Sequence, residues 1–120
     1  MITYTLECLE EYMQIKGNAM ASGDGALDRE QEDWIRRQLR AGNRWARCCA
    51  KVTATFELGG VTFSGVAYLG CCSYLSEEDF KQSDGYYPQM CDEAREDMIA
   101  TLHYAIKYGI KAKQALEVLS

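Results

Sequence analysis

Residues 45–74 read WARCCAKVTATFELGGVTFSGVAYLGCCSY, and this stretch decides the fold. Two runs of alternating residues meet at Gly59-Gly60. A Gly-Gly pair supplies the positive φ angles that a two-residue turn requires, and flanking runs with a period of two are typical of strands. The sequence therefore predicts an antiparallel β-hairpin with strands at about 45–58 and 61–74.

The turn also sets which residues face each other across the hairpin. The expected pairs, counted outward, are Leu58–Val61, Phe56–Phe63, Ala54–Gly65, Val52–Ala67, Ala50–Leu69 and Cys48–Cys71. This face is apolar, and its middle carries only small side chains at Ala54 and Gly65. Small side chains leave room for a helix to approach the sheet closely.

The opposite face of the hairpin is polar near the turn and aromatic at its far end. The expected pairs at the far end are Trp45–Tyr74, Arg47–Cys72, Cys49–Gly70 and Lys51–Tyr68. An aromatic cluster of this size is unfavourable in water. We therefore expect this end to be buried, either by an N-terminal helix or by a second copy of the chain.

The segments before the hairpin predict two helices. Apolar residues recur at helical spacing over residues 2–13, which favours a helix from about Thr3 to Met20. Residues 2–6 also alternate as a strand would, so that alternative stays open. Asp28 is a good N-cap for a second helix, which is expected to stop near Gly42.

A short helical turn and a long helix are expected after the hairpin. Ser76 is placed to cap a turn that ends around Phe80. Pro88 at a first helical position opens the long helix, whose first turns are rich in acids, as the helix dipole favours. Gly109 is expected to break or bend this helix, and residues 111–119 are expected to form a further short helix. The apolar stripe expected to pack on the hairpin is Met90, Ala94, Met98, Leu102, Ala105 and Ile106.

Length and composition limit the class of protein. At 120 residues the chain has the size of one domain, and 48% hydrophobic residues with a single proline favour a folded globule. The N-terminal sequence lacks a basic stretch followed by a long apolar run, so we expect a soluble, cytoplasmic protein that does not enter a membrane. The six cysteines are then expected to be reduced thiols.

Charge is unevenly distributed along the chain, whose net charge is −5. Acids are concentrated after the hairpin, at Glu77, Glu78, Asp79, Asp84, Asp92, Glu93, Glu96 and Asp97. Bases are concentrated earlier, at Arg29, Arg36, Arg37, Arg40, Arg44, Arg47 and Lys51. Either the two groups pair inside the molecule, or the acids form a surface for a basic partner such as a nucleic-acid-binding protein. The negative net charge disfavours direct binding to nucleic acid.

Residue types that carry metal or catalytic chemistry are present but poorly arranged. In the doublets Cys48-Cys49 and Cys71-Cys72, adjacent strand residues point to opposite faces, so neither doublet can chelate a metal. His103 is the single histidine, and Cys91 on the same helix lies about 18 Å from it at about 1.5 Å per residue. We therefore expect no metal, no cofactor and no catalytic residue, and an enzyme is the least favoured interpretation.

The central region resembles a small-protein pattern of phages and other mobile elements. The matching pieces are Trp45-Ala46-x-Cys48, Val52-Thr53-Ala54, Leu69-Gly70-x-Cys72-Ser73-Tyr74, Asp79-Phe80 and Gly85-Tyr86-Tyr87, followed by Met90 and Glu93-Ala94. The resemblance implies a mobile-element setting and, for a phage protein, the cytoplasm of the host cell. It carries over no catalytic residues.

These features predict one α+β domain over residues 1–120, with the antiparallel hairpin packed against N-terminal helices and a long C-terminal helix. The favoured function is binding of a host protein or nucleoprotein complex through the acids, for example as an anti-CRISPR-like inhibitor of a host defence complex, by a monomer or a homodimer. The alternative is sequestration of a small, nucleotide-type ligand. Its candidate binding residues are Arg47, Lys51, Trp45 and Tyr68.

Overall fold

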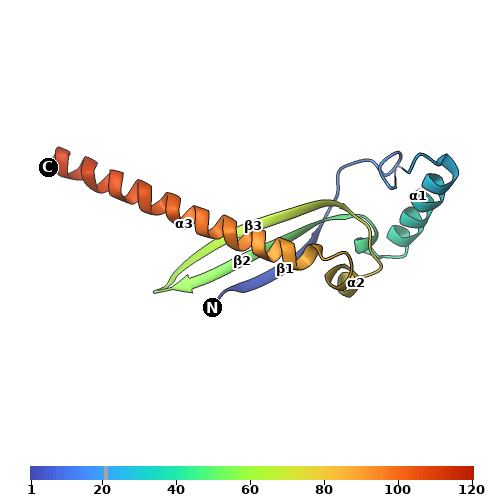
Figure 1. The fold of residues 1–120 in the computed structure, drawn as a ribbon, viewed down its shortest axis with the longest axis horizontal. Coiled ribbons are helices and arrows are strands. Elements are labelled where there is room, and N and C mark those ends of the chain that lie inside the picture. The colour runs from blue at the N-terminus through green and yellow to red at the C-terminus, as the bar shows by residue number, and fades with distance from the viewer. Residues whose placement is uncertain (21) are drawn as a thin grey trace.

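The computed structural model, which describes residues 1–20 and 22–120, has a three-stranded antiparallel sheet with a long helix across one face (Figure 1). The strands are β1 (Thr3–Leu9), β2 (Cys48–Leu58) and β3 (Val61–Cys72), in the order β1-β2-β3. The helices are α1 (Gly25–Arg40), α2 (Glu77–Gln82) and α3 (Tyr86–Leu119), and a 3-10 turn, η1, spans Arg44–Ala46. The predicted α+β class is confirmed.

The hairpin of β2 and β3 forms around Gly59 and Gly60. Their φ angles of 61° and 80° are the positive values that the two-residue turn requires. The predicted pairs are confirmed from the turn outward as far as Ala50 and Leu69. Turn chemistry therefore sets the register over most of both strands.

The register changes at the far end of the hairpin. Cys48 pairs with Cys72 instead of Cys71, because an extra residue on β3 forms a β-bulge. Cys71 has a φ of 56°, in the left-handed region. The shift brings Cys72 to the apolar face, where it is buried, so the expected pair of Arg47 with Cys72 is also wrong. Trp45 lies in η1, outside the strand predicted for it.

The first part of the predicted N-terminal helix is wrong, because residues 3–9 form β1. This strand pairs antiparallel with β2, and Leu6 lies opposite Val52. Tyr4 and Leu6 are half-buried, whereas Thr5 between them is exposed. The period-two alternation and the hydrogen bonds to β2 therefore outweigh the helical spacing. Residues 10–20 form no helix and lead from β1 toward α1 as an irregular loop, called here the β1–α1 loop.

Helix α1 begins earlier than predicted. The carboxylate of Asp24 accepts hydrogen bonds from the N–H groups of Ala26 and Leu27, so Asp24 is the N-cap. Asp28 lies inside the helix and accepts hydrogen bonds from the N–H and hydroxyl of Ser22. The helix ends just before Gly42, as predicted.

Helix α2 and the start of α3 follow the predicted capping with small shifts. The hydroxyl of Ser76 accepts a hydrogen bond from the N–H of Asp79, as an N-cap does, and α2 ends at Gln82. Helix α3 begins at Tyr86, so Pro88 occupies its third position instead of the first. Proline fits there because the first N–H groups of a helix have no intrahelical acceptor.

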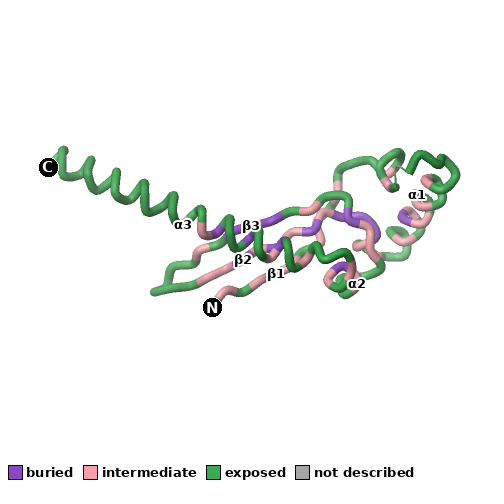
Figure 2. The backbone as a smooth tube through the Cα atoms, in the orientation of Figure 1, coloured by how far each residue is buried: buried purple, intermediate pink, exposed green. Residues whose placement is uncertain are grey.

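Helix α3 lies across the apolar face of β2 and β3, as predicted. A Cβ atom at Gly65 would overlap the backbone of Ala94 and Met98, so helix and strand touch directly. Figure 2 shows the resulting buried stretches along β2 and β3. The core consists of Cys48, Ala50, Val52, Ala54, Ala67, Cys72, Phe80, Met90 and Ala94.

Helix α3 continues past the end of the sheet. It runs unbroken through Gly109 to Leu119, so the predicted break at Gly109 is wrong. A glycine inside a helix costs only about 1 kcal/mol relative to alanine, which neighbouring good helix formers offset. Residues 103–119 project beyond the sheet and are exposed throughout (Figure 2). The molecule is therefore elongated, with extents of 71 × 27 × 23 Å.

Candidate binding surface

The acids predicted to bind a partner lie on α2, on the first half of α3 and, for Asp84, in the short segment between them. Five of these acids are exposed and, among the described residues, form no hydrogen bond or ion pair outside their own helix, and they are called here the acidic surface. It consists of Glu77, Glu78, Asp92, Glu93 and Glu96. The buried methionines and alanine of α3 occupy the side that faces the sheet, which leaves Asp92, Glu93 and Glu96 on the remaining sides of that helix.

Two of the predicted acids hold the segment around α2 together. Asp79 is half-buried, and it accepts hydrogen bonds of 2.9 Å from the N–H of Leu75 and the hydroxyl of Ser83. The expectation that Asp79 is exposed is therefore wrong. Asp84 accepts a hydrogen bond of 2.9 Å from the hydroxyl of Tyr74. Burial of the ring and, to a smaller extent, this hydrogen bond raise the pKa of Tyr74.

Asp97 has a structural contact of a different kind. Its Oδ2 accepts a hydrogen bond of 2.9 Å from the backbone N–H of Val66. Strand β3 pairs with β2 on one side only, so this N–H lies on the free edge of the sheet. Asp97 thus attaches α3 to that edge.

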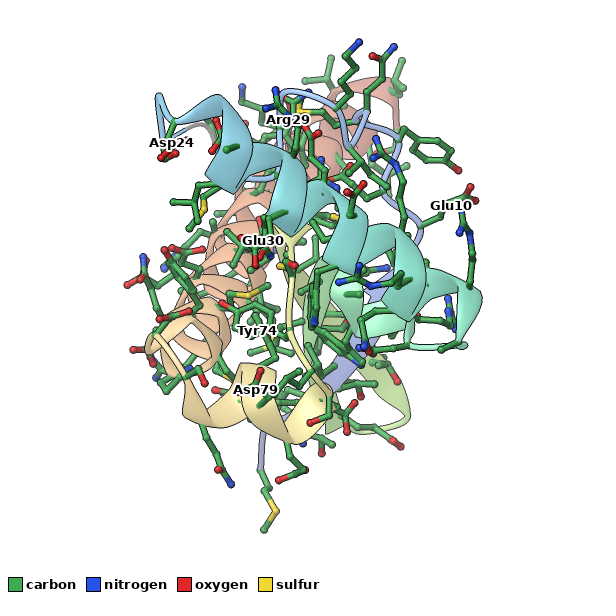
Figure 3. The ribbon with its side chains drawn as sticks, turned by 90° about the vertical axis from the view of Figure 1, so that its right-hand side faces the viewer. Glu10, Asp24, Arg29, Glu30, Tyr74 and Asp79 are labelled. Carbon is green, nitrogen blue, oxygen red and sulfur yellow. The ribbon has the colours of Figure 1, made fainter. Side chains whose placement is uncertain are left out.

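The separation of acids from bases along the chain is preserved in the fold. The ion pairs formed by the described residues are Arg36–Asp33 at 3.4 Å and Lys81–Glu77 at 3.9 Å, and each lies within one helix. Within the described part of the chain, none joins the bases of 29–51 to the acids of 77–97. Figure 3 shows Arg29 on α1 and Asp79 on α2 in separate parts of the molecule. Internal pairing of the two groups is therefore wrong.

The residues predicted to bind a small ligand do not gather in one place. Lys51 and Tyr68 lie side by side across the strands, with the lysine Nζ 5.8 Å from the centre of the ring. Tyr68 is 56% exposed, so the predicted burial of this end is wrong for it. Trp45 lies elsewhere and stacks on Phe80, with ring centroids 5.1 Å apart. Arg47, the fourth candidate, is buried under the β1–α1 loop.

Arg47 is bound by backbone carbonyl groups of this loop. Its Nη1 donates to the carbonyl of Asn18 at 3.1 Å, and Nη2 donates to those of Met13 and Gln14 at 3.4 and 3.2 Å. The side chain is only 6% exposed, and a buried guanidinium requires such acceptors. At the far end of the hairpin the loop therefore covers Arg47, where an N-terminal helix or a second copy of the chain was expected.

Two glutamates hold the same loop and were missed in the sequence. Glu32 of α1 is 7% exposed and accepts a hydrogen bond of 2.7 Å from the N–H of Gly17. Glu11 accepts hydrogen bonds from the N–H groups of Met13 and Cys71. Both hydrogen bonds lower the pKa of Glu11 below its usual 4.5, and the one from the N–H of Cys71 has the larger effect. Isolated charges in a loop carry no sequence pattern that would have revealed these contacts.

A cavity of about 560 Å³ lies under the β1–α1 loop. Its charged lining residues are Arg44, Arg47, Glu10 and Glu11, and neither Trp45 nor Tyr68 lines it. Arg44 and Arg47 already donate to backbone carbonyls, and the two glutamates balance their charge. The cavity therefore has no excess charge with which to select a nucleotide phosphate.

The cysteines are free thiols in the structure. Cys48 and Cys72 pair across β2 and β3 and are both buried, and the neighbouring thiol of Cys72, together with burial, raises the pKa of Cys48. His103 lies on the exposed part of α3, away from this pair. Within the described ranges, no three His, Cys, Asp or Glu side chains are grouped to hold a metal ion.

The exposed charge of the acidic surface, which among the described residues forms no ion pair with the bases of 29–51, is the feature that points most directly to a function. Across residues 1–20 and 22–120, no helix combines the length and hydrophobicity needed to cross a bilayer. The chain matches no protein-family model, no curated protein and no solved structure.

Proposed function

We propose that this is an accessory protein of a phage or another mobile element that binds a basic host protein or nucleoprotein complex through its acidic surface and inhibits it. The observation that carries the proposal is the lack of ion pairs, among the described residues, between the acids of 77–97 and the bases of 29–51. Carboxylates without an internal partner gain electrostatic energy chiefly from a partner of opposite charge.

The acidic surface is also held on rigid elements. The capped helix α2 and the packed first half of α3 carry its side chains. Among the described residues, Glu78 and Glu96 have no hydrogen-bond or ion-pair partner. A charged surface that is fixed before binding loses little conformational entropy when a partner docks.

The chemistry of the partner follows from the charge. Complexes that bind nucleic acid present grooves of arginine and lysine to the phosphate backbone. A fixed array of carboxylates can compete for such a groove, and the resemblance to mobile-element proteins supports a host defence complex as the target. The ligand-sequestering alternative has less support, because its candidate residues lie apart and Arg47 holds the β1–α1 loop.

Charge-reversal variants test the proposal. Host complexes captured with the wild-type protein would be used to measure association rates at low and at physiological salt. We expect the Glu78→Lys, Glu93→Lys, Glu96→Lys triple variant to lose at least about tenfold in affinity, and the wild-type on-rate to fall as salt rises.

A matched control changes the net charge equally at another place. Glu10, Glu30 and Glu57 are exposed and lie outside the acidic surface, so their triple replacement by lysine should retain most of the affinity. If both triple variants bind as the wild type does, while Arg47 or Lys51 replacements abolish binding, the acidic surface is not the binding site.

A further inference from the structure

The projecting half of α3 has no covering surface within its own chain. In residues 103–119 the large apolar residues are at least half exposed, for example Ile106 at 60%, Ile110 at 55% and Leu116 at 68%. A helix of this length without tertiary contacts is marginal in water. Burial of its apolar side chains would stabilise it. We therefore expect another protein surface to cover this half of α3.

Residues 86–102 of α3, called here the packed half, lie on the sheet, and residues 103–119 are the projecting half. One side of the helix continues from the packed half into the projecting half. Neighbouring residues of a helix lie about 100° apart, so Asp97 and Ile99 are on opposite sides of the buried Met98. Asp97 reaches the free edge of β3, so Ile99 lies on the side toward β2 and β1. Residues spaced by three or four along this side form what we call the inner side of α3. They are Asp92, Arg95, Ile99, Leu102, Ile106, Ile110 and Lys113.

The sheet beneath the inner side is only partly covered. Helix α3 packs on β3 and β2. On β1, Tyr4 and Leu6 pair with the buried Ala54 and Val52 and thus point to the same face, yet both remain half-buried. An apolar helix laid beside the inner side would cover these two side chains as well.

We propose that this helix is the projecting half of α3 from a second copy of the chain, in an antiparallel pair related by a twofold axis near Leu102. The distribution of charge along α3 favours a second copy of the chain in this antiparallel orientation. Residues 86–102 contain four acids and one base, whereas 103–119 contain three lysines and one acid. Antiparallel pairing places opposite charges together, and parallel pairing would place like charges together.

The sequence of the inner side fits this symmetry. With the axis near Leu102, Asp92 lies beside Lys113 of the partner subunit, and Ile99 lies beside Ile106 of the partner subunit. The 34 residues of α3 divide there into equal halves, each about 26 Å long at about 1.5 Å per residue. Each projecting half thus covers the packed half of the other copy, so the interface closes on itself.

Exchange of a charge pair tests the dimer. By sedimentation over a range of micromolar concentrations, the wild type should dimerise, and Asp92→Lys or Lys113→Asp alone should weaken dimerisation by at least about tenfold. The double variant carries both charges reversed, so it should recover most of the affinity. Ile106→Asp should also weaken the dimer, and circular dichroism should show that each variant keeps its fold.

Glu30→Lys on α1 is the control and should leave dimerisation unchanged. A wild-type protein that stays monomeric at every concentration overturns the proposal, as does a dimer that none of these variants weakens. Single reversals that weaken the dimer without rescue in the double variant overturn the antiparallel pairing. Asp92 belongs both to the acidic surface and to the inner side, so the Asp92→Lys variant is used to test dimerisation alone. Binding of the host complex is tested with the Glu78→Lys, Glu93→Lys, Glu96→Lys triple variant, whose dimerisation is measured alongside.

Discussion

The Cα atom of Gly65 faces the backbone of Met98 with no side chain between them. A methyl group at this position would overlap backbone atoms, which cannot turn aside as a flexible side chain can. We therefore expect Gly65→Ala to push α3 off the sheet and to lower the free energy of unfolding by about 3 kcal/mol, as severe overpacking does. Urea denaturation followed by circular dichroism measures the loss.

Gly109→Ala is the matched control for this change. Gly109 lies in the same helix, and a Cβ atom there meets nothing within 4 Å. Alanine is the better helix former, so this variant should be more stable by about 0.5–1 kcal/mol. A Gly65→Ala protein that is as stable as the wild type would contradict the direct contact of helix and strand.

The ring of Trp45 predicts a second effect on stability. It stacks on Phe80, which Tyr74 also contacts edge-on at a centroid distance of 5.0 Å. Trp45→Ala should lower the free energy of unfolding by about 3 kcal/mol, as aromatic truncations in a core do. Tyr68→Ala should cost far less, because that ring is 56% exposed. Equal midpoints of denaturation for these two variants would argue against the aromatic cluster.

The environment of Glu11 predicts that the folded protein loses stability in acid. Its pKa is lowered in the folded state, chiefly by the hydrogen bond from the N–H of Cys71. The stabilisation is therefore complete above the unfolded-state pKa of 4.5 and is lost as the pH falls through the lower folded-state value. Glu11→Gln should be less stable than the wild type at neutral pH, and the difference should shrink as the pH falls below about 4. Thermal melts across this pH range would show it, and a constant difference would contradict it.

The cysteines should differ in their reactivity. Cys71 is exposed at the bulge, whereas Cys48 and Cys72 are buried in the core. Although burial and Glu11 raise the pKa of Cys71, access of the reagent decides the order. Mass spectrometry after brief alkylation of the native protein should find modification at Cys71 first. Cys48 should react only after unfolding, and equal rates for both would contradict the packing.

Local chemistry made much of the fold predictable. The Gly59-Gly60 turn set the hairpin register, and small side chains such as Gly65 predicted the close approach of α3. Both features depend on residues that are near in sequence or on a repeating pattern. The first part of the apolar stripe, Met90, Ala94 and Met98, was predicted for the same reason and is buried, whereas its members Ala105 and Ile106 lie beyond the sheet and are exposed.

The errors arose where distant segments decide the structure. Residues 3–9 carry a mixed pattern, and their pairing with residues of β2 that lie at least forty positions later makes them a strand. The bulge at Cys71 depends on a left-handed φ at a residue that does not favour it. Arg47 could not be recognised as a buried anchor, because its acceptors are backbone carbonyls that every sequence supplies. The exposure of most of the acids was predicted, but the hydrogen bonds of Asp79, Asp84 and Asp97 were not.

The hydrogen bond from Val66 to Asp97 also bears on how the protein avoids aggregation. A free strand edge offers unpaired N–H and C=O groups to any other extended chain. On β3 the carboxylate of Asp97 occupies one of these N–H groups and places a negative charge beside the edge. An approaching strand would have to displace that carboxylate and tolerate the charge, so β3 is protected from growth into a larger, intermolecular sheet.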